Sequence, residues 1–155
     1  MSIVCFKDGV MAADTRAIHD DAGIVRTTKL MRKRIGRREH LLGFAGDVSY
    51  AMLFCDWYGS GKPMPDQLKS IPEEKKFSVL IYAGKKLYEA DGICRPLEVE
   101  AKFYAIGSGS QAAIGAMHSG ASALQAAKIA CKIDSACGLP VQSMTLPTRV
   151  RGVHV

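Results

Sequence analysis

The fold is decided by the opening stretch of the chain, Met1-Ser2-Ile3-Val4-Cys5-Phe6-Lys7-Asp8-Gly9-Val10-Met11-Ala12-Ala13-Asp14. Side chains over residues 2–7 alternate with the period of a half-buried strand, and Asp8-Gly9 is a strong hairpin-turn signal. Residues 10–13 then return antiparallel to the first strand. Pairing across this turn brings the carboxylate of Asp14 close to the start of the chain.

The residue after the initiator methionine is a serine, which is small enough to permit methionine removal. Removal would leave Ser2 with its own free amine. A serine hydroxyl is a poor nucleophile unless a base lies within hydrogen-bond reach. An α-amine has a reference pKa of roughly 7.7 to 8, so it is partly neutral near neutral pH and suits that task. Because serine is a common second residue, this chemistry needs support from the rest of the chain.

Length and composition predict one soluble globular domain over residues 1–155, with a basic C-terminal tail from about residue 147. The chain is 48% hydrophobic and 23% charged, which is ordinary for such a domain. Its apolar runs are too short to cross a bilayer, and the N-terminus lacks a signal-peptide pattern. We therefore expect a cytoplasmic protein.

The cysteines carry no metal-binding or disulfide pattern. They are odd in number and scattered, without a CxxC pair or a Cys/His cluster at metal spacing. Their positions are Cys5, Cys55, Cys94, Cys131 and Cys137. Buried free thiols are therefore the expectation, and we expect neither a metal nor a cofactor.

The net charge of +6 is concentrated in one cluster, Arg32-Lys33-Arg34-Ile35-Gly36-Arg37-Arg38, and in the tail residues Arg149 and Arg151. Gly36 predicts that the cluster lies at a turn. Such a cluster could grip phosphates. It has no aromatic residue for stacking and no helix for a groove, so a solvated turn or a docking surface for a protein partner is favoured over nucleic-acid binding.

The first half of the chain predicts hairpins followed by a helix. Residues 15–23 are polar and predict a loop, and residues 25–31 predict a strand that carries Lys29. A further strand is expected over residues 39–44. Asp47 is a suitable N-cap for the next helix, whose aromatic stripe indicates a core face. A glycine- and proline-rich linker over residues 59–65 follows, and then a short helical turn.

The second half predicts strands and two alanine-rich helices. Strands are expected over residues 77–82, 87–90, 103–106 and 141–146, and helices over residues 111–118 and 121–135. Strands in hairpins, then paired helices, then strands again, indicate an α+β fold. We expect a four-layer αββα sandwich of two antiparallel sheets flanked by helices.

One glycine motif has two interpretations. Gly107-Ser108-Gly109-Ser110-Gln111-Ala112 follows a strand and opens a helix, as a dinucleotide-binding turn does. That motif also requires a second strand and an acidic residue roughly 20 residues later, and here the chain is still helical. The backbone N–H groups of such a turn suit oxyanions in general.

Several motifs together resemble a known family. The stretch Lys7-Asp8-Gly9-Val10-Met11-Ala12-Ala13-Asp14-Thr15-Arg16 is similar to the opening of proteasome β-type subunits and HslV peptidases, which are N-terminal-nucleophile (Ntn) hydrolases. The resemblance runs to about Leu146. It implies a self-compartmentalising peptidase that hydrolyses peptide bonds with Ser2 after Met1 removal. It further implies homo-oligomeric stacked rings, protein or peptide substrates, and an AAA+ ATPase unfoldase as a partner.

The resemblance also assigns roles to Ser2, Asp14, Lys29, Gly46, Ser108 and Asp134. It implies that Ser2 attacks the scissile carbonyl with its own amine as base, beside the acidic Asp14. The charge of Lys29 would favour the neutral amine. The Gly46 N–H would stabilise the oxyanion, and Ser108 and Asp134 match the supporting serine and aspartate of the family.

Three features depart from the family pattern. Ser2 replaces the usual threonine and lacks the methyl group that restrains the rotamer, so slower turnover is expected. Cys137 stands where proteasome subunits have a serine. Residues 59–74 are short where the family has a second long helix, which affects the usual oligomer contacts.

Three alternatives stay open. The first is a small-molecule amidase of the same superfamily, which would prefer free amides to peptides. The second is a catalytically inactive, ring-forming scaffold of the same fold, because with Met1 attached Ser2 has an amide in place of its base. The third is a nucleic-acid module, whose binding would depend steeply on salt.

Overall fold

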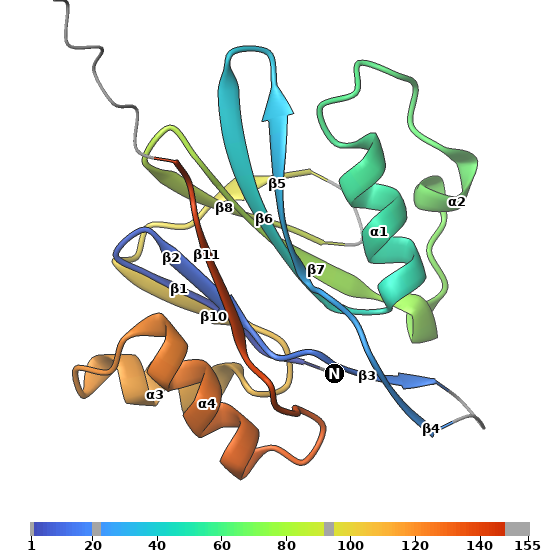
Figure 1. Cartoon of the computed structure of the whole chain (residues 1–155). Helices are drawn as coiled ribbons and strands as arrows, with labels where there is room; N and C mark the ends of the chain where they lie inside the picture. The colour runs from blue at the N-terminus through green and yellow to red at the C-terminus, as the bar shows by residue number, and fades with distance from the viewer. Residues whose placement is uncertain (1, 20–22, 92–94, 148–155) are drawn as a thin grey trace, which may run out of the picture.

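The predicted N-terminal hairpin forms the centre of a sheet. The computed structural model describes residues 2–19, 23–91 and 95–147 (Figure 1). β1 (Val4–Lys7) pairs antiparallel with β2 (Val10–Ala13). Asp8 and Gly9 in the turn have φ values of 53° and 78°, which is the backbone that a tight two-residue hairpin requires.

Two more strands complete this sheet, in the order β10-β1-β2-β11. β10 (Phe103–Ile106) and β11 (Gln142–Thr145) both pair antiparallel with the hairpin. The N-terminal hairpin therefore lies between strands that come from the far end of the chain.

The second sheet is an antiparallel meander of five strands. Its members are β5 (Leu30–Ile35), β6 (Arg38–Gly46), β7 (Phe77–Ala83), β8 (Lys86–Ala90) and β9 (Leu97–Glu98). The short strand β9 has no counterpart in the sequence-based prediction.

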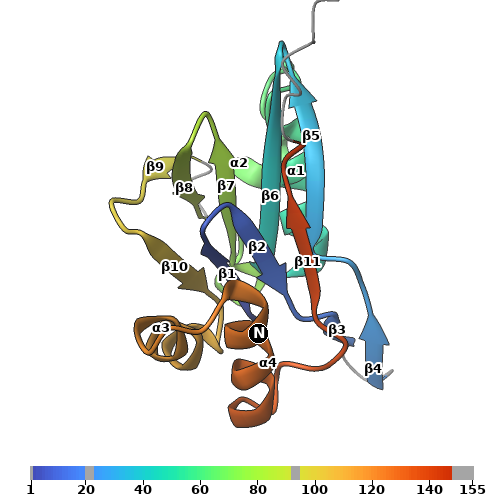
Figure 2. The same ribbon diagram turned by 60° about the vertical axis from the view of Figure 1, so that its left-hand side comes forward.

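Helices cover the outer face of each sheet, as Figures 1 and 2 show. α3 (Ser110–His118) and α4 (Ala123–Ile133) pack on the four-stranded sheet. α1 (Val48–Trp57) packs on β6 and β7 of the other sheet, with α2 (Asp66–Lys69) beside it and a short 3₁₀ turn, Glu73–Lys75, following. The predicted αββα sandwich is confirmed.

Three apolar clusters fill the three spaces between these layers. Val4, Met11 and Leu80 belong to the cluster between the two sheets. Gly43 of β6 lets the sheets approach, because a Cβ on Gly43 would lie 2.7 Å from Cγ1 of Val4 and 2.6 Å from Sδ of Met11. The hairpin that begins the chain is thus packed tightly against the second sheet.

The region between the first hairpin and the second sheet differs from the prediction. Residues 15–23 were expected to form a loop and residues 25–31 a strand. Instead β3 (Arg16–His19) and β4 (Gly23–Arg26) form a separate two-stranded hairpin, and Lys29 lies in the connector before β5. The prediction was wrong because the large apolar side chains of this hairpin, Ile18, Ile24 and Val25, are exposed, so that no buried apolar face marks it.

The basic cluster lies at the turn of the β5–β6 hairpin, as predicted. Only Gly36 and Arg37 form the turn, while Arg32 and Lys33 lie within β5. Lys33 donates hydrogen bonds of 2.7 Å to the carbonyls of Cys55 and Asp56. These carbonyls lie near the C-terminus of α1, where a cation is favourable.

Other predictions about α1 and its surroundings are confirmed. Asp47 caps α1 by accepting a hydrogen bond of 2.9 Å from the Tyr50 N–H. Residues 59–76 contain only the four-residue α2 and the 3₁₀ turn, so this fully described segment has no second long helix.

Within the described ranges, no helix is long and apolar enough to span a membrane. Cys5, Cys55 and Cys137 are buried free thiols, and Cys131 is partly buried. Cys94 and the tail residues Arg149 and Arg151 lie outside the described residues.

Phe54 on α1 tests the packing of the helix on the second sheet. Replacing Phe54, which is fully buried among apolar neighbours, by alanine should lower the free energy of unfolding by about 3–5 kcal/mol. Urea denaturation measures this loss. Met52→Ala on the same helix is the control, since Met52 is 46% exposed and should cost less than about 1 kcal/mol. Equal losses in the two variants would contradict the packing.

Candidate active site

Ser2 lies two residues before the first residue of β1 and is 2% exposed. Its carbonyl accepts a hydrogen bond of 3.2 Å from the Gly109 N–H. Gly107, with φ 96°, passes so close that a Cβ there would lie 2.2 Å from the Ser2 carbonyl oxygen. The glycine turn that opens α3 therefore holds the backbone of Ser2, which explains why glycine is needed at position 107.

Lys29 brings a positive charge to the Ser2 hydroxyl. Its ammonium donates hydrogen bonds of 2.7 Å to Oγ of Ser2, 2.7 Å to Oδ1 of Asp14 and 2.5 Å to the carbonyl of Arg16. An ammonium has three protons and no acceptor. Lys29 therefore uses its full donor capacity, although it is only 1% exposed.

Asp14 is the buried counter-ion of Lys29. Its side chain is fully buried, and it follows β2, where the hairpin brings it opposite the start of β1. Oδ1 accepts from the Ile3 N–H at 3.2 Å, and Oδ2 accepts from the Arg16 N–H at 3.3 Å and the Gly138 N–H at 3.0 Å. The predicted proximity of Asp14 to the chain start is confirmed.

Ser108, Asp134 and Cys137 form a second group of side chains near Ser2. Oγ of Ser108 lies 3.5 Å from the Ser2 carbonyl oxygen, at the outer limit of a hydrogen bond. Hydrogen bonds from the Ser108 hydroxyl and the Ala136 N–H lower the pKa of the Asp134 carboxyl. Oδ2 of Asp134 accepts a hydrogen bond of 3.4 Å from the thiol of Cys137. Desolvation raises the pKa of that thiol to about 12, so it stays neutral at physiological pH.

Gly46 ends β6 on the same side of the molecule as Ser2. The preceding residue, Ala45, would be 3.2 Å from a Cβ on Gly107, which itself borders the Ser2 carbonyl. Gly46 has φ 98°, and a Cβ there would lie 2.5 Å from the carbonyl oxygen of Lys76. Glycine is therefore required at position 46 for backbone reasons. Its role toward an oxyanion stays a prediction.

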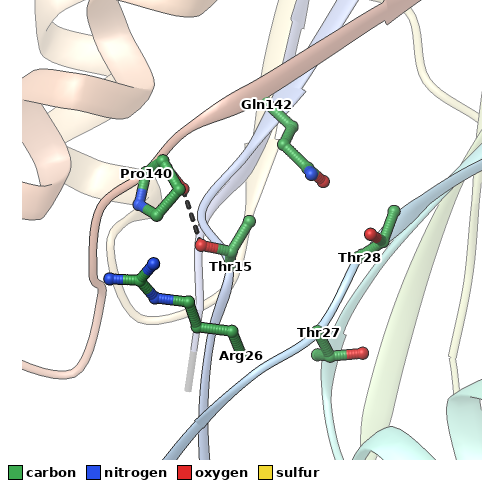
Figure 3. Close-up of a pocket in the computed structure, with 6 residues that line it drawn as sticks. All are labelled: Thr15, Arg26, Thr27, Thr28, Pro140 and Gln142. Carbon is green, nitrogen blue, oxygen red and sulfur yellow. Dashed lines mark hydrogen bonds between the residues drawn. The ribbon is translucent and has the colours of Figure 1, made fainter.

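A polar pocket of about 180 Å³ lies beside this cluster (Figure 3). It is lined by Thr15, Arg26, Thr27, Thr28, Pro140 and Gln142. Two of these lining residues are sequence neighbours of the buried ion pair, because Thr15 follows Asp14 and Thr28 precedes Lys29. The Thr15 hydroxyl donates a hydrogen bond of 2.7 Å to the Pro140 carbonyl, which fixes one wall of the pocket.

The site also uses groups that sequence reasoning missed. The Arg16 carbonyl accepts a hydrogen bond from Lys29, and the Gly138 N–H donates one to Asp14. The Arg16 guanidinium donates a hydrogen bond of 2.8 Å to the Ser135 carbonyl. Backbone groups leave no signal in residue type. The adjacency of Thr15-Arg16 to Asp14 within the family-like stretch was the only available pointer.

The arrangement places a hydroxyl, a buried cation and a buried carboxylate in one hydrogen-bonded row. Such a row can stabilise negative charge that develops on the hydroxyl oxygen. Among the residues that the structure describes, no group of three or more His, Cys, Asp or Glu side chains is placed to hold a metal ion.

Lys29→Met tests the buried pair. Methionine fills a similar volume but leaves the Asp14 carboxylate buried without its counter-ion, so the free energy of unfolding should fall by about 3–5 kcal/mol. Urea denaturation provides the measurement. The double variant Asp14→Asn/Lys29→Met removes both charges and should be more stable than Lys29→Met alone. A cost below about 1 kcal/mol for Lys29→Met would contradict the pairing.

Comparison with known proteins places this geometry in a structural context. No protein-family model and no curated protein sequence matches the chain, but many solved structures do. BPH from Thiobacillus denitrificans is 22% identical with a TM-score of 0.67, covering 94% of this chain and 96% of BPH. Another structure of BPH contains epoxomicin.

Two further structures agree with BPH. HslV from Trypanosoma brucei is 19% identical with a TM-score of 0.61, covering 94% of this chain and 99% of HslV. Anbu from Yersinia bercovieri is 14% identical with a TM-score of 0.71, covering 95% of this chain and 81% of Anbu. The chain therefore has the fold of HslV, BPH and Anbu, and the resemblance to HslV-like Ntn hydrolases that its sequence predicts is confirmed at the level of the fold.

Proposed function

We propose that this chain is a serine-type N-terminal-nucleophile peptidase that becomes active when Met1 is removed. The observation that carries the proposal is the hydrogen bond of 2.7 Å from the Lys29 ammonium to Oγ of Ser2, within a buried ion pair. A lysine that served only to stabilise the fold would not need to donate a hydrogen bond to the hydroxyl of the second residue. The fold shared with HslV and BPH supports the same function.

The base in this mechanism is the amine of Ser2. Lys29 cannot be the base, because a protonated ammonium has no lone pair to accept the hydroxyl proton. Its three protons are donated in hydrogen bonds to Ser2, Asp14 and Arg16. The amine that Met1 removal creates lies on the reacting residue itself. The neighbouring positive charge favours the neutral form of that amine, which is the form that accepts a proton.

Catalysis then proceeds in two stages. Oγ of Ser2 bonds to the scissile carbonyl carbon while the amine takes the hydroxyl proton. The tetrahedral oxyanion receives a hydrogen bond from the Gly46 N–H, and its collapse expels the peptide amine, which leaves with the proton. Water, deprotonated by the same amine, cleaves the resulting Ser2 ester and restores the hydroxyl. Ser108 borders the Ser2 carbonyl during both stages, and Asp134 positions Ser108 by a hydrogen bond.

The remaining expectations from the sequence belong to this proposal. The chain acts as one domain over residues 1–155, in the cytoplasm, as a homo-oligomer of stacked rings that takes protein or peptide substrates from an AAA+ unfoldase. Anbu from Pseudomonas aeruginosa forms a helical assembly, which supports self-association of this fold.

The decisive variants change only the nucleophile. In a fluorogenic peptide assay with protein that has lost Met1, Ser2→Ala should reduce turnover by more than about a thousandfold, because no other hydroxyl can form the ester. Ser2→Thr should retain activity, since it keeps both the hydroxyl and the amine. Unchanged turnover in Ser2→Ala would overturn the proposal. A comparison with small free amides distinguishes a peptidase from an amidase.

A further inference from the structure

Large apolar side chains lie exposed at one end of the molecule. Among the residues that the structure describes, eight large apolar side chains are exposed, and six of these lie on the β3–β4 hairpin, on α4 or in the loop after α4. We call these six residues the apolar end. They are Ile18, Ile24, Val25, Ile129, Ile133 and Leu139. None of the six belongs to the three apolar clusters that fill the core of the described chain.

The hairpin and the end of α4 are held side by side. The Thr15 N–H donates a hydrogen bond of 3.3 Å to the Gly138 carbonyl. The guanidinium of Arg16, the first residue of β3, donates a hydrogen bond of 2.8 Å to the Ser135 carbonyl. The loop after α4 therefore lies against the start of β3. Figures 1 and 2 both show the C-terminal end of α4, this loop and the β3–β4 hairpin at the same end of the molecule.

Each of the two parts presents an apolar face to water. Ile18 and Ile24 are opposite each other in the β3–β4 register, so their side chains share one face of the hairpin, and they are 57% and 64% exposed. Ile129 and Ile133 are four residues apart on α4 and share one face of that helix, and Ile133 is 70% exposed. An isolated two-stranded hairpin is marginally stable in water. Exposed apolar side chains gathered in this way mark a surface that another molecule covers.

We propose that the apolar end is the surface through which copies of this chain associate, with the β3–β4 hairpin of one copy packed against α4 of its partner. The flat hairpin and the ridge of α4 differ in shape, and a two-fold pair covers both at once, because each copy supplies the element that the other lacks. The inference rests on the homo-oligomer of the proposed function and identifies the surface that forms it.

The composition of the apolar end favours a second copy over an occasional partner. Interfaces with occasional partners are about as apolar as the rest of a protein surface, whereas the interfaces of homodimers are more apolar. Four of the six residues are isoleucines. Lys128 and Lys132 flank the isoleucines of α4 and can extend their ammonium groups to a polar rim. A second copy is present wherever the chain is made, so the apolar end need not stay open to aggregation.

The test is sedimentation velocity of the full chain at protein concentrations from about 1 to 100 µM, which measures self-association. The test variant is Ile24→Lys/Ile133→Lys, which places one charge on each part of the apolar end. The matched control is Met52→Lys/Leu97→Lys, which adds the same charges at the two exposed large apolar residues of the described chain that lie elsewhere. If the test variant does not fold, Ile24→Thr/Ile133→Gln replaces it, because threonine suits a strand and glutamine suits a helix.

We expect the parent chain to associate, and the test variant to raise the dissociation constant of association at least about tenfold, because each ammonium would lose water at the interface. The control should change this constant by less than about threefold. Unchanged association of the test variant, or equal weakening in both variants, would overturn the proposal and leave the homo-oligomer of the proposed function standing. A parent chain that stays monomeric over this range would overturn both, and a different molecule would then cover the apolar end. None of these results bears on the peptidase mechanism, which the Ser2→Ala assay tests separately.

Discussion

The whole candidate site depends on one buried ion pair, between the ammonium of Lys29 and the carboxylate of Asp14, 2.7 Å apart. Removing both charges from water costs several kcal/mol per ion, and the cost is recovered only where partners satisfy every proton and lone pair. Here the Ser2 hydroxyl and the Arg16 carbonyl accept the remaining hydrogen bonds of the Lys29 ammonium. Three backbone N–H groups donate hydrogen bonds to the Asp14 carboxylate. The pair consequently ties the chain start, the end of β2, the connector before β5 and the loop after α4 to a single point.

The fold positions Ser2 through close approaches of backbone. Gly107 allows the turn before α3 to touch the Ser2 carbonyl, and Gly43 allows β6 to pack against Val4 and Met11. These contacts fix the first strand between the helices and the second sheet, so that the hydroxyl of Ser2 meets an ammonium that is already in place. A charge held in position before reaction stabilises developing negative charge without reorganising.

The sequence predicts those parts of the structure that local signals encode. The tight turn at Asp8-Gly9, the N-cap Asp47 and the glycine turn before α3 all follow from short-range backbone preferences, and each is confirmed. The β3–β4 hairpin was missed because it buries neither face, and Lys29 was therefore placed in a strand rather than in a connector. The donors and acceptors from Arg16 and Gly138 could not be predicted, because backbone groups at any residue type can serve and only the tertiary fold brings them together.

The most direct measurement is the intact mass of the protein purified from its host, before and after treatment with a β-lactone probe that acylates N-terminal nucleophiles. If Ser2 is the nucleophile and its own amine is the base, the mass should show loss of Met1, and one adduct should map to Ser2. Full retention of Met1 with no adduct would contradict the peptidase mechanism. The geometry around Ser2 would then belong to a catalytically inactive scaffold of the same fold.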